Sequence, residues 1–333
     1  MRLSQPLSPL IVTPCLLLVL LAGIASAAIG GSTFALTLTD LFNAVLGDAQ
    51  NLAAQLVLTI RLPRVLIAAT VGAALALAGT LMQGITRNPL ASPALFGLNA
   101  GAGCLLVLVQ TGLLPVPLPL MLATALGAAL AGGLVLMLGG GLQGRIHPVR
   151  VVLAGVAVTA LLTAMTRSLL ILDEQAQAVV DWLSGSLVDA DWHHWQQLWP
   201  WVLPAGLATL WLAQPLNLLA LGEEMAAGLG VSPRRLRLQA SLLVVILAAT
   251  SVAVTGPIAF VGLLVPHLGR ALVGSDHRVL LPLVAVLGAA LMVWADLLSR
   301  LLVFPAETPV GLVTALIGAP CFLWLAARQR GAS

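Results

Sequence analysis

The stretch from Leu216 to Leu238 reads LNLLALGEEMAAGLGVSPRRLRL, and it carries two adjacent carboxylates and three arginines between two long apolar runs. Each flanking run is long enough to cross a membrane. Local signals predict two short helices on the membrane surface: Asn217 caps the first turn, and Gly228 or Gly230 closes the second helix. Ser232, with a proline directly after it, predicts the start of the next span.

Two features of this stretch indicate a contact surface for another protein. Ala226, Ala227 and Gly228 would form a small face that another backbone can approach closely. Glu223 and Glu224 beside it offer negative charge to a basic partner. The alternative interpretation is an ordinary loop that its charges keep solvated.

The composition is that of a helical membrane protein. Of the 333 residues, 60% are hydrophobic and 8% are charged, and the mean hydropathy is +1.06. These values lie outside the range of soluble domains, so we predict an all-α polytopic membrane protein. All 15 cationic side chains are arginine. A Walker A loop needs a lysine on the phosphates, so any ATPase that drives this chain must be another polypeptide.

The residues predict no enzyme, no cofactor and no metal site. Cys15, Cys104 and Cys321 are isolated in apolar surroundings and lack the CxxC spacing of a metal or redox motif. There is no nucleophile–base arrangement. The pI near 9.3 does not indicate nucleic-acid binding, because no basic tract with interleaved aromatic residues is present.

Ten apolar segments, with an uncertainty of about one, form a single membrane domain over residues 1–333. The predicted spans cover about residues 10–30, 61–84, 97–114, 120–138, 151–172, 192–214, 236–254, 258–270, 279–298 and 310–327. The first span precedes a semi-polar external segment, residues 31–60, and the bundle proper covers residues 61–327. Residues 25–27 resemble a signal-peptidase site, but retention of the first segment is the favoured interpretation, because its apolar run is long enough to span and many spans follow.

Arginine placement predicts the orientation. With both termini in the cytoplasm, eleven arginines lie inside and four outside, as the positive-inside rule requires. The outer four are Arg61, Arg64, Arg167 and Arg300. This orientation puts the stretch around Glu223, residues 216–232, in the cytoplasm.

Three of the outer arginines predict a docking surface. Arg61 and Arg64 share one helical face, and with Arg300 they would form a cationic rim at the ends of spans. Such a rim suits the carboxylates of a soluble external protein. The alternative interpretation is snorkelling to lipid phosphate.

Breaks within the spans predict a gate or pathway. Broken backbone at membrane depth is tolerated only where protein or a water-filled cavity satisfies it. The candidate residues are Asn88, Pro89, Pro93, Gly256, Pro257, Pro266 and His267, although proline and glycine are also simply common in membrane helices. Asp296 and His267 are the ionisable groups nearest to span interiors, and no partner for a proton relay is apparent at helical spacing.

Several motifs follow one another along about residues 55–327. They are, in order, RLPR at 61–64, GAALALAG at 72–79, Gln83 with NPLASP at 88–93, LAGV at 153–156, WLSGS at 182–186, AGLGV at 227–231, GPIAFVGLLVPH at 256–267 and PVGLVTALIGAP at 309–320. In this order and spacing they resemble the iron-siderophore and cobalamin permeases of bacterial type II ATP-binding-cassette (ABC) importers, and most closely the permeases for ferric citrate and related chelates.

The resemblance implies a ten-helix subunit of a permease dimer in the bacterial inner membrane. The implied partners are two cytoplasmic ATPases, a periplasmic substrate-binding protein and a second permease, either a copy or a paralogue. It assigns coupling to the ATPase to Glu223, Glu224, Ala226, Ala227, Leu229 and Gly230, and binding-protein docking to Arg61, Arg64 and Arg300. Which of the two carboxylates contacts the ATPase stays open.

Other functions remain to be compared with this one. A cobalamin or haem permease would belong to the same family. An ion-coupled secondary transporter belongs to a different class and would need an intramembrane ion site, for which Asp296 alone is poor material. A membrane scaffold without transport activity is disfavoured by the prolines that interrupt the spans.

Overall fold

A computed structural model of the chain describes residues 9–30, 52–141, 148–172, 182–303 and 305–330, together with Thr39 and Val179. Every regular element in this part of the chain is helical. Five helices are long and apolar enough to span a membrane, one bent pair forms a sixth, and four shorter apolar helices complete the set. The described residues therefore hold ten apolar helical segments, and the predicted all-α polytopic fold is confirmed.

The long helices are α1 (Pro9–Ile29), α4 (Leu62–Thr86), α6 (Leu120–Leu136), α7 (Pro148–Leu172), α9 (Trp192–Trp211), α12 (Pro233–Thr255), α14 (His277–Leu301) and α15 (Val310–Arg330). The shorter ones are α3 (Leu52–Leu56), α5 (Leu98–Gln110), α10 (Ala213–Ala220), α11 (Glu223–Gly228) and α13 (Val261–Val273). A π-helical turn, Val57–Arg61, joins α3 to α4. Two further short turns are π-helical at Met137–Gly141 and 3-10 at Pro93–Phe96.

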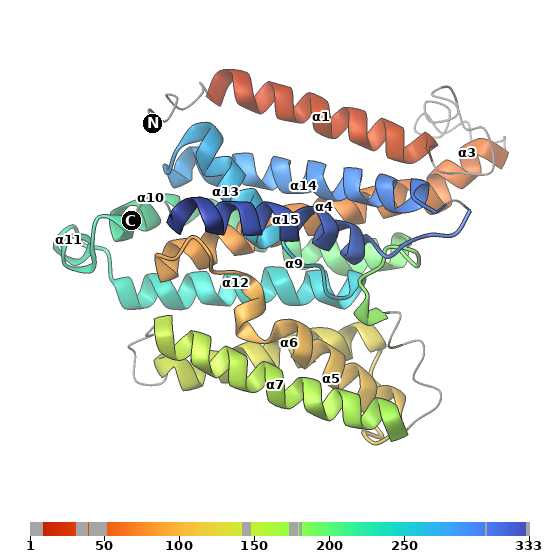
Figure 1. Cartoon of the computed structure of the whole chain (residues 1–333), viewed down its shortest axis with the longest axis horizontal. Helices are drawn as coiled ribbons and strands as arrows, with labels where there is room; N and C mark the ends of the chain where they lie inside the picture. Colours follow the sequence, from red (N-terminus) through yellow and green to blue (C-terminus); the bar gives the residue numbers. More distant parts are fainter. Residues whose placement is uncertain are drawn as a thin grey trace.

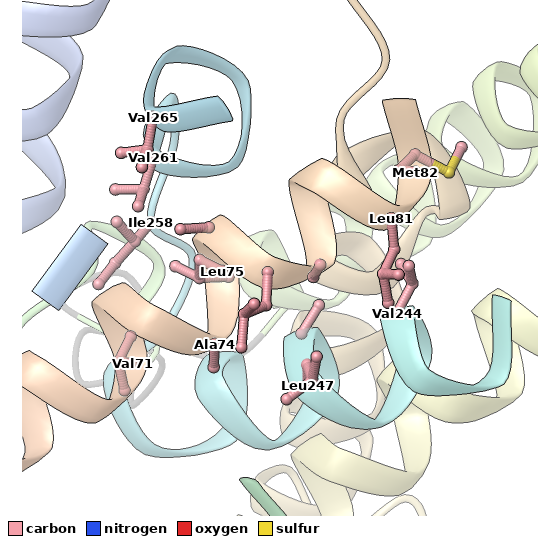
Figure 2. Packing of buried hydrophobic residues seen from close by; sticks show 14 of the residues in the cluster. Val71, Ala74, Leu75, Leu81, Met82, Val244, Leu247, Ile258, Val261 and Val265 are labelled. Atoms are coloured by element: carbon pink, nitrogen blue, oxygen red, sulfur yellow. The ribbon is translucent and has the colours of Figure 1, made fainter. Parts of the chain in front are cut away.

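Helix α4 is the centre of the bundle, with α14 along one side and α12 along another (Figure 1). Figure 2 shows the contact with α12, where Ala74 lies near Leu247 and Leu81 near Val244. All four side chains are buried, at 2% exposure or less. A helix surrounded on all sides explains why its sequence is apolar around its whole circumference rather than along one stripe.

Glycines let α4 lie unusually close to its neighbours, as small residues do in membrane bundles. A Cβ added to Gly72 would overlap the carbonyl oxygen of Gly288 in α14, and one added to Gly288 would overlap that of Gly72. A Cβ on Gly79 would overlap the backbone of Gly262 in α13. Backbone-to-backbone packing therefore explains the glycines at positions 72 and 79 of α4.

We expect Gly79→Ala to lower the free energy of unfolding by about 1–3 kcal/mol, because the added methyl group forces the α4 and α13 backbones apart. The measurement is the thermal midpoint of the purified protein in detergent. Gly133→Ala is the matched control, since nothing lies within 4 Å of a Cβ at that position in α6. Equal midpoints for the two variants would contradict the close packing.

The edges of the bundle are much less covered than its centre. In Figure 1, α1 forms one edge against α14, and α7 forms the opposite edge beside α5 and α6. Within the most apolar part of α7 only 22% is buried, against 78% for the span that contains α4. The outer face of α7 is thus available to lipid or to another membrane protein.

Most local predictions for the stretch around Glu223 are confirmed. Two short helices are present as α10 and α11, and the Ser232 hydroxyl accepts a hydrogen bond from the Arg235 backbone N–H at the start of α12. The prediction for Asn217 is wrong, because this residue lies inside α10. Pro266 also does not break a span, since α13 continues through it.

The predicted external segment, residues 31–60, lies mostly outside the described residues. Its last part is helical and runs through the π-helical turn into α4, so that residues 52–86 form one 35-residue span. The second span thus begins about ten residues earlier than predicted.

Candidate functional site

Helices α10 and α11 lie at one end of the bundle (Figure 1). With the two residues after α11, they contain the residues predicted to couple to an ATPase, and we call residues 213–230 the coupling segment after that prediction. Glu223 and Glu224 are exposed there, and Met225 and Leu229 expose 60% and 58% of their surface. These four residues line a groove of about 880 Å³. Exposed apolar side chains beside acidic ones are typical of a protein contact surface.

Of the residues predicted to couple to the ATPase, Ala226 is placed differently from expectation. It is 0% exposed, and its carbonyl accepts a hydrogen bond from Val231 at 2.9 Å, so it packs inward and cannot touch another protein. Ala227 and Gly230 are exposed as expected. Sequence reasoning missed Met225, whose place on the exposed face of α11 depends on which side of this helix turns inward.

Hydrogen bonds attach the coupling segment to three spans. The Arg87 guanidinium, at the end of α4, donates to the Leu219 carbonyl at 2.5 Å. Glu223 pairs with Arg237 of α12 at 2.5 Å. The third attachment joins Asn217 to the start of α14. A movement of α10 and α11 therefore acts on α4, α12 and α14 together.

The attachment to α14 is an Asn–Asp bridge. The Asn217 amide donates to Asp276 Oδ1 at 2.6 Å, and Asn217 Oδ1 accepts from the His277 backbone N–H at 2.9 Å. Asp276 caps α14 by accepting from the Arg278 N–H at 2.9 Å. These bonds, first that from Arg278 and then that from Asn217, lower the pKa of Asp276, so this carboxylate is ionised at neutral pH.

We expect Asn217→Asp to lower the free energy of unfolding by about 1–2 kcal/mol, because it exchanges a donor for a second carboxylate beside Asp276. The double variant Asn217→Asp/Asp276→Asn restores one amide and one carboxylate and should recover at least half of the loss. Thermal midpoints of the wild type, of Asn217→Asp, of Asp276→Asn and of the double variant test this bridge. A double variant less stable than both single variants would contradict it.

The opposite end of the bundle, where α3 lies in Figure 1, holds a buried ionic group that we call the Asp296 cluster. It consists of Arg64, Asp296, Arg300 and Glu307. Arg64 Nε lies 2.9 Å from Asp296 Oδ1, and Arg64 Nη1 lies 2.8 Å from Glu307 Oε2. Arg300 Nη2 lies 3.1 Å from Asp296 Oδ2. Exposure is 5% for Arg64, 1% for Arg300 and 0% for Asp296.

The cluster corrects two expectations. Arg64 and Arg300 do not stand on an open rim, because a buried guanidinium requires a paired charge and both turn inward to Asp296. The second correction concerns Asp296, for which the sequence showed no partner at helical spacing: it pairs with Arg64 and with Arg300, which lies four residues further along α14. Of the three arginines predicted to form the rim, Arg61 is the most exposed, although it is itself half-buried at the end of the π-helical turn.

The broken segments of two spans meet around one cavity of about 350 Å³. One side is the turn that contains Pro93, and the other is the segment between α12 and α13, where Gly256 and Phe260 have φ angles of 69° and 67°. A left-handed conformation is rare for phenylalanine and stores strain. The cavity is lined by Leu75, Leu90, Ser92, Pro93, Ala94, Leu98, Asn99, Ala248, Val252, Ile258, Ala259, Phe260, Gly262, Leu263 and Phe322.

Helix α15 closes this cavity. Phe322 lines it, and Gly318 packs so closely on Phe260 that a Cβ there would overlap the ring. Pro89 and His267 line a much smaller neighbouring pocket with Gly318, and Asn88 Oδ1 accepts a hydrogen bond from the Leu90 N–H at 2.9 Å. The predicted gate residues thus lie close together, except that Pro266 sits within a regular helix.

Two helices connect the two ends of the molecule. Helix α4 holds Arg64 of the Asp296 cluster near its start, and Arg87, which bonds to the coupling segment, follows its last residue. Helix α14 begins at the Asn217–Asp276 bridge and holds Arg300 of the Asp296 cluster near its end. Each has 25 residues, or about 37 Å of helix. A bundle with a cavity at broken spans and polar sites at both ends of the same helices is the architecture of a multi-pass membrane permease.

Comparison with known proteins gives the family. The chain belongs to the FecCD transport family, whose model matches residues 16–328. It is 45% identical to the Fe(3+)-citrate import system permease protein YfmD of Bacillus subtilis, over 82% of this chain and 81% of that protein. It is 44% identical to the Fe(3+) dicitrate transport system permease protein FecC of Escherichia coli, over 86% of each chain.

Two further comparisons bear on substrate and fold. The hemin transport system permease protein HmuU of Yersinia pestis is 42% identical, over 94% of this chain and 95% of that protein. A solved structure described as an inward-facing conformation of a metal-chelate type ABC transporter superposes with a TM-score of 0.82 at 31% identity, covering 96% of this chain and all of that one. The resemblance to iron-chelate permeases and the predicted permease fold are both confirmed.

Proposed function

We propose that this chain is the permease subunit of an ABC importer that moves ferric citrate or a similar ferric chelate across the bacterial inner membrane by alternating access. The observation that carries this proposal is the identity of 44–45% to two ferric citrate permeases over more than four fifths of the chain. Transport is this subunit's role, and ATP hydrolysis belongs to separate ATPase subunits.

The coupling segment is the contact with two cytoplasmic ATPases, one for each permease of a dimer. Its exposed acidic and apolar side chains and its bonds to three spans support this assignment. Helices α1 and α15 begin and end, respectively, at the same end of the bundle as α11 (Figure 1). This agrees with both termini in the cytoplasm.

The end that holds the Asp296 cluster faces a periplasmic binding protein. Arg61 makes the first contact with a carboxylate of that protein, while Arg64 and Arg300 lie behind it. The second permease, a copy or a paralogue, covers the exposed face of α7, and lipid covers the remaining apolar surface. The chelate passes between the two permeases, and the broken segments around Phe260 form the gate.

A haem importer is the second candidate, because the hemin permease is 42% identical over nearly the whole chain. The experiment compares uptake of labelled ferric citrate and labelled hemin by cells with and without this gene, with its partner genes intact. Loss of ferric citrate uptake alone supports the proposal. Loss of hemin uptake alone would replace it, and loss of neither would refute both.

Docking is tested with Arg61→Glu rather than with Arg64, whose replacement would disrupt a buried ion pair. The variant is expected to lose binding-protein docking and uptake while it still assembles with the ATPases. Asp189→Arg, at an exposed residue near Trp192 at the same end of the bundle, is the charge-reversal control and should keep uptake. Unchanged uptake in Arg61→Glu would contradict the assignment.

A further inference from the structure

We infer that Glu307 is an internal substitute for the binding protein's carboxylate: it occupies Arg64 until docking and is then displaced. This inference rests on the proposed docking surface and adds to it a residue that controls access. Glu307 lies in the connection between α14 and α15, and its Oε2 is 2.8 Å from Arg64 Nη1. An external carboxylate that pairs with Arg64 Nη1 must therefore replace Glu307.

The two carboxylates on Arg64 differ in how easily they can leave. Asp296 is 0% exposed and bridges Arg64 to Arg300, so its departure would remove a carboxylate from two buried cations at once. Glu307 is 32% exposed and pairs with Arg64 alone among the described ion pairs. A partly exposed pair is screened by water and contributes little free energy. Glu307 is therefore the partner that exchanges.

The burial of Arg64 makes this exchange selective. A guanidinium with 5% exposure has little contact with water, so exchange of Glu307 for another carboxylate is more favourable than loss of Glu307 without a replacement. Displacement of Glu307 must therefore coincide with the arrival of another carboxylate. A basic or neutral surface cannot open this contact, so the partner must be a protein that presents Asp or Glu at its docking face.

Exchange at Arg64 also reaches the cavity. Glu307 precedes α15 by three residues, and the next residue, Thr308, donates both its N–H and its hydroxyl to the Ser299 carbonyl, at 3.1 and 2.7 Å. Further along α15, Gly318 packs against Phe260 at the cavity. Release of Glu307 frees one attachment of the α15 entrance, which gives docking a direct route to the helix that closes the cavity.

The test is the affinity of the binding protein, loaded with ferric citrate, for the permease–ATPase complex in lipid nanodiscs without nucleotide. Glu307→Gln removes the charge that competes with the binding protein for Arg64. It should lower Kd by about three- to fivefold, the change in affinity that corresponds to the free energy of one partly exposed ion pair. Glu307→Ala should do the same. Asp189→Asn removes an equivalent charge from an exposed residue near Trp192, whose indole bonds to the Leu58 carbonyl at this end of the bundle. It should change Kd by less than about 1.5-fold.

The outcomes separate this inference from the docking proposal. Tighter binding in both Glu307 variants but not in Asp189→Asn supports exchange. Unchanged or weaker binding in variants whose thermal midpoints match the wild type overturns it, even if Arg61→Glu abolishes docking. If Arg61→Glu leaves docking intact, the docking surface itself is wrong.

Discussion

Replacing Asp296 by asparagine is expected to lower the free energy of unfolding by about 3–5 kcal/mol, a larger loss than that expected for Gly79→Ala or Asn217→Asp. The substitution keeps the shape of the side chain but removes the carboxylate charge that, among the described residues, pairs with both Arg64 and Arg300, which expose 5% and 1% of their surface. Two guanidinium groups would then be left buried with too little compensating charge.

Thermal and denaturant unfolding in detergent measure this loss. The matched control is Glu223→Gln, which breaks the pair with Arg237 at the other end of the bundle, where the glutamate is 52% exposed. Because an exposed pair contributes little, the control should lose less than about 1 kcal/mol. Equal losses in the two variants would show that burial does not distinguish the two ion pairs.

The double variant Met225→Glu/Leu229→Glu is expected to lose ATPase co-purification and to lower ATP-dependent uptake by at least about 100-fold. Both side chains are more than half exposed on the coupling segment. Their burial against a partner would contribute about 1.5–3 kcal/mol each, and each tenfold in affinity is about 1.4 kcal/mol. The new carboxylates would also have to be desolvated in the apolar part of the contact, where burial of an unpaired charge is costly.

The measurement is a pull-down with the tagged permease, together with chelate uptake in cells. Val188→Glu is the control, because Val188 is also exposed, at 53%, but precedes α9 at the other end of the bundle. It should retain the ATPase. A double variant that still brings down the ATPase would remove α11 from the proposed interface.

Features that depend on neighbouring residues were predicted well from the sequence. The end of α11 and the start of α12 at Ser232 follow from glycine, serine and proline within a few positions of each other. The ten apolar segments follow from their length and composition. Asn217 was predicted wrongly because its bonds go to Asp276 and His277, about 60 residues away in the chain.

Features that depend on distant residues were missed or misplaced. Arg64 turns inward because its partner Asp296 is 232 residues away, and no local pattern reports that contact. One signal was available: Asp296 and Arg300 are four residues apart, the spacing of an ion pair on one helical face. The left-handed Phe260 and the burial of Ala226 depend on how helices pack, which composition does not specify.

Dependence of transport on a separate ATPase is tested most directly by uptake of radiolabelled ferric citrate into proteoliposomes of defined composition. With the permease, its ATPase subunits, the binding protein and ATP all present, the label should accumulate. With the permease alone, or without ATP, it should not. Accumulation by the purified permease alone would contradict the claim that this chain depends on a separate ATPase for transport.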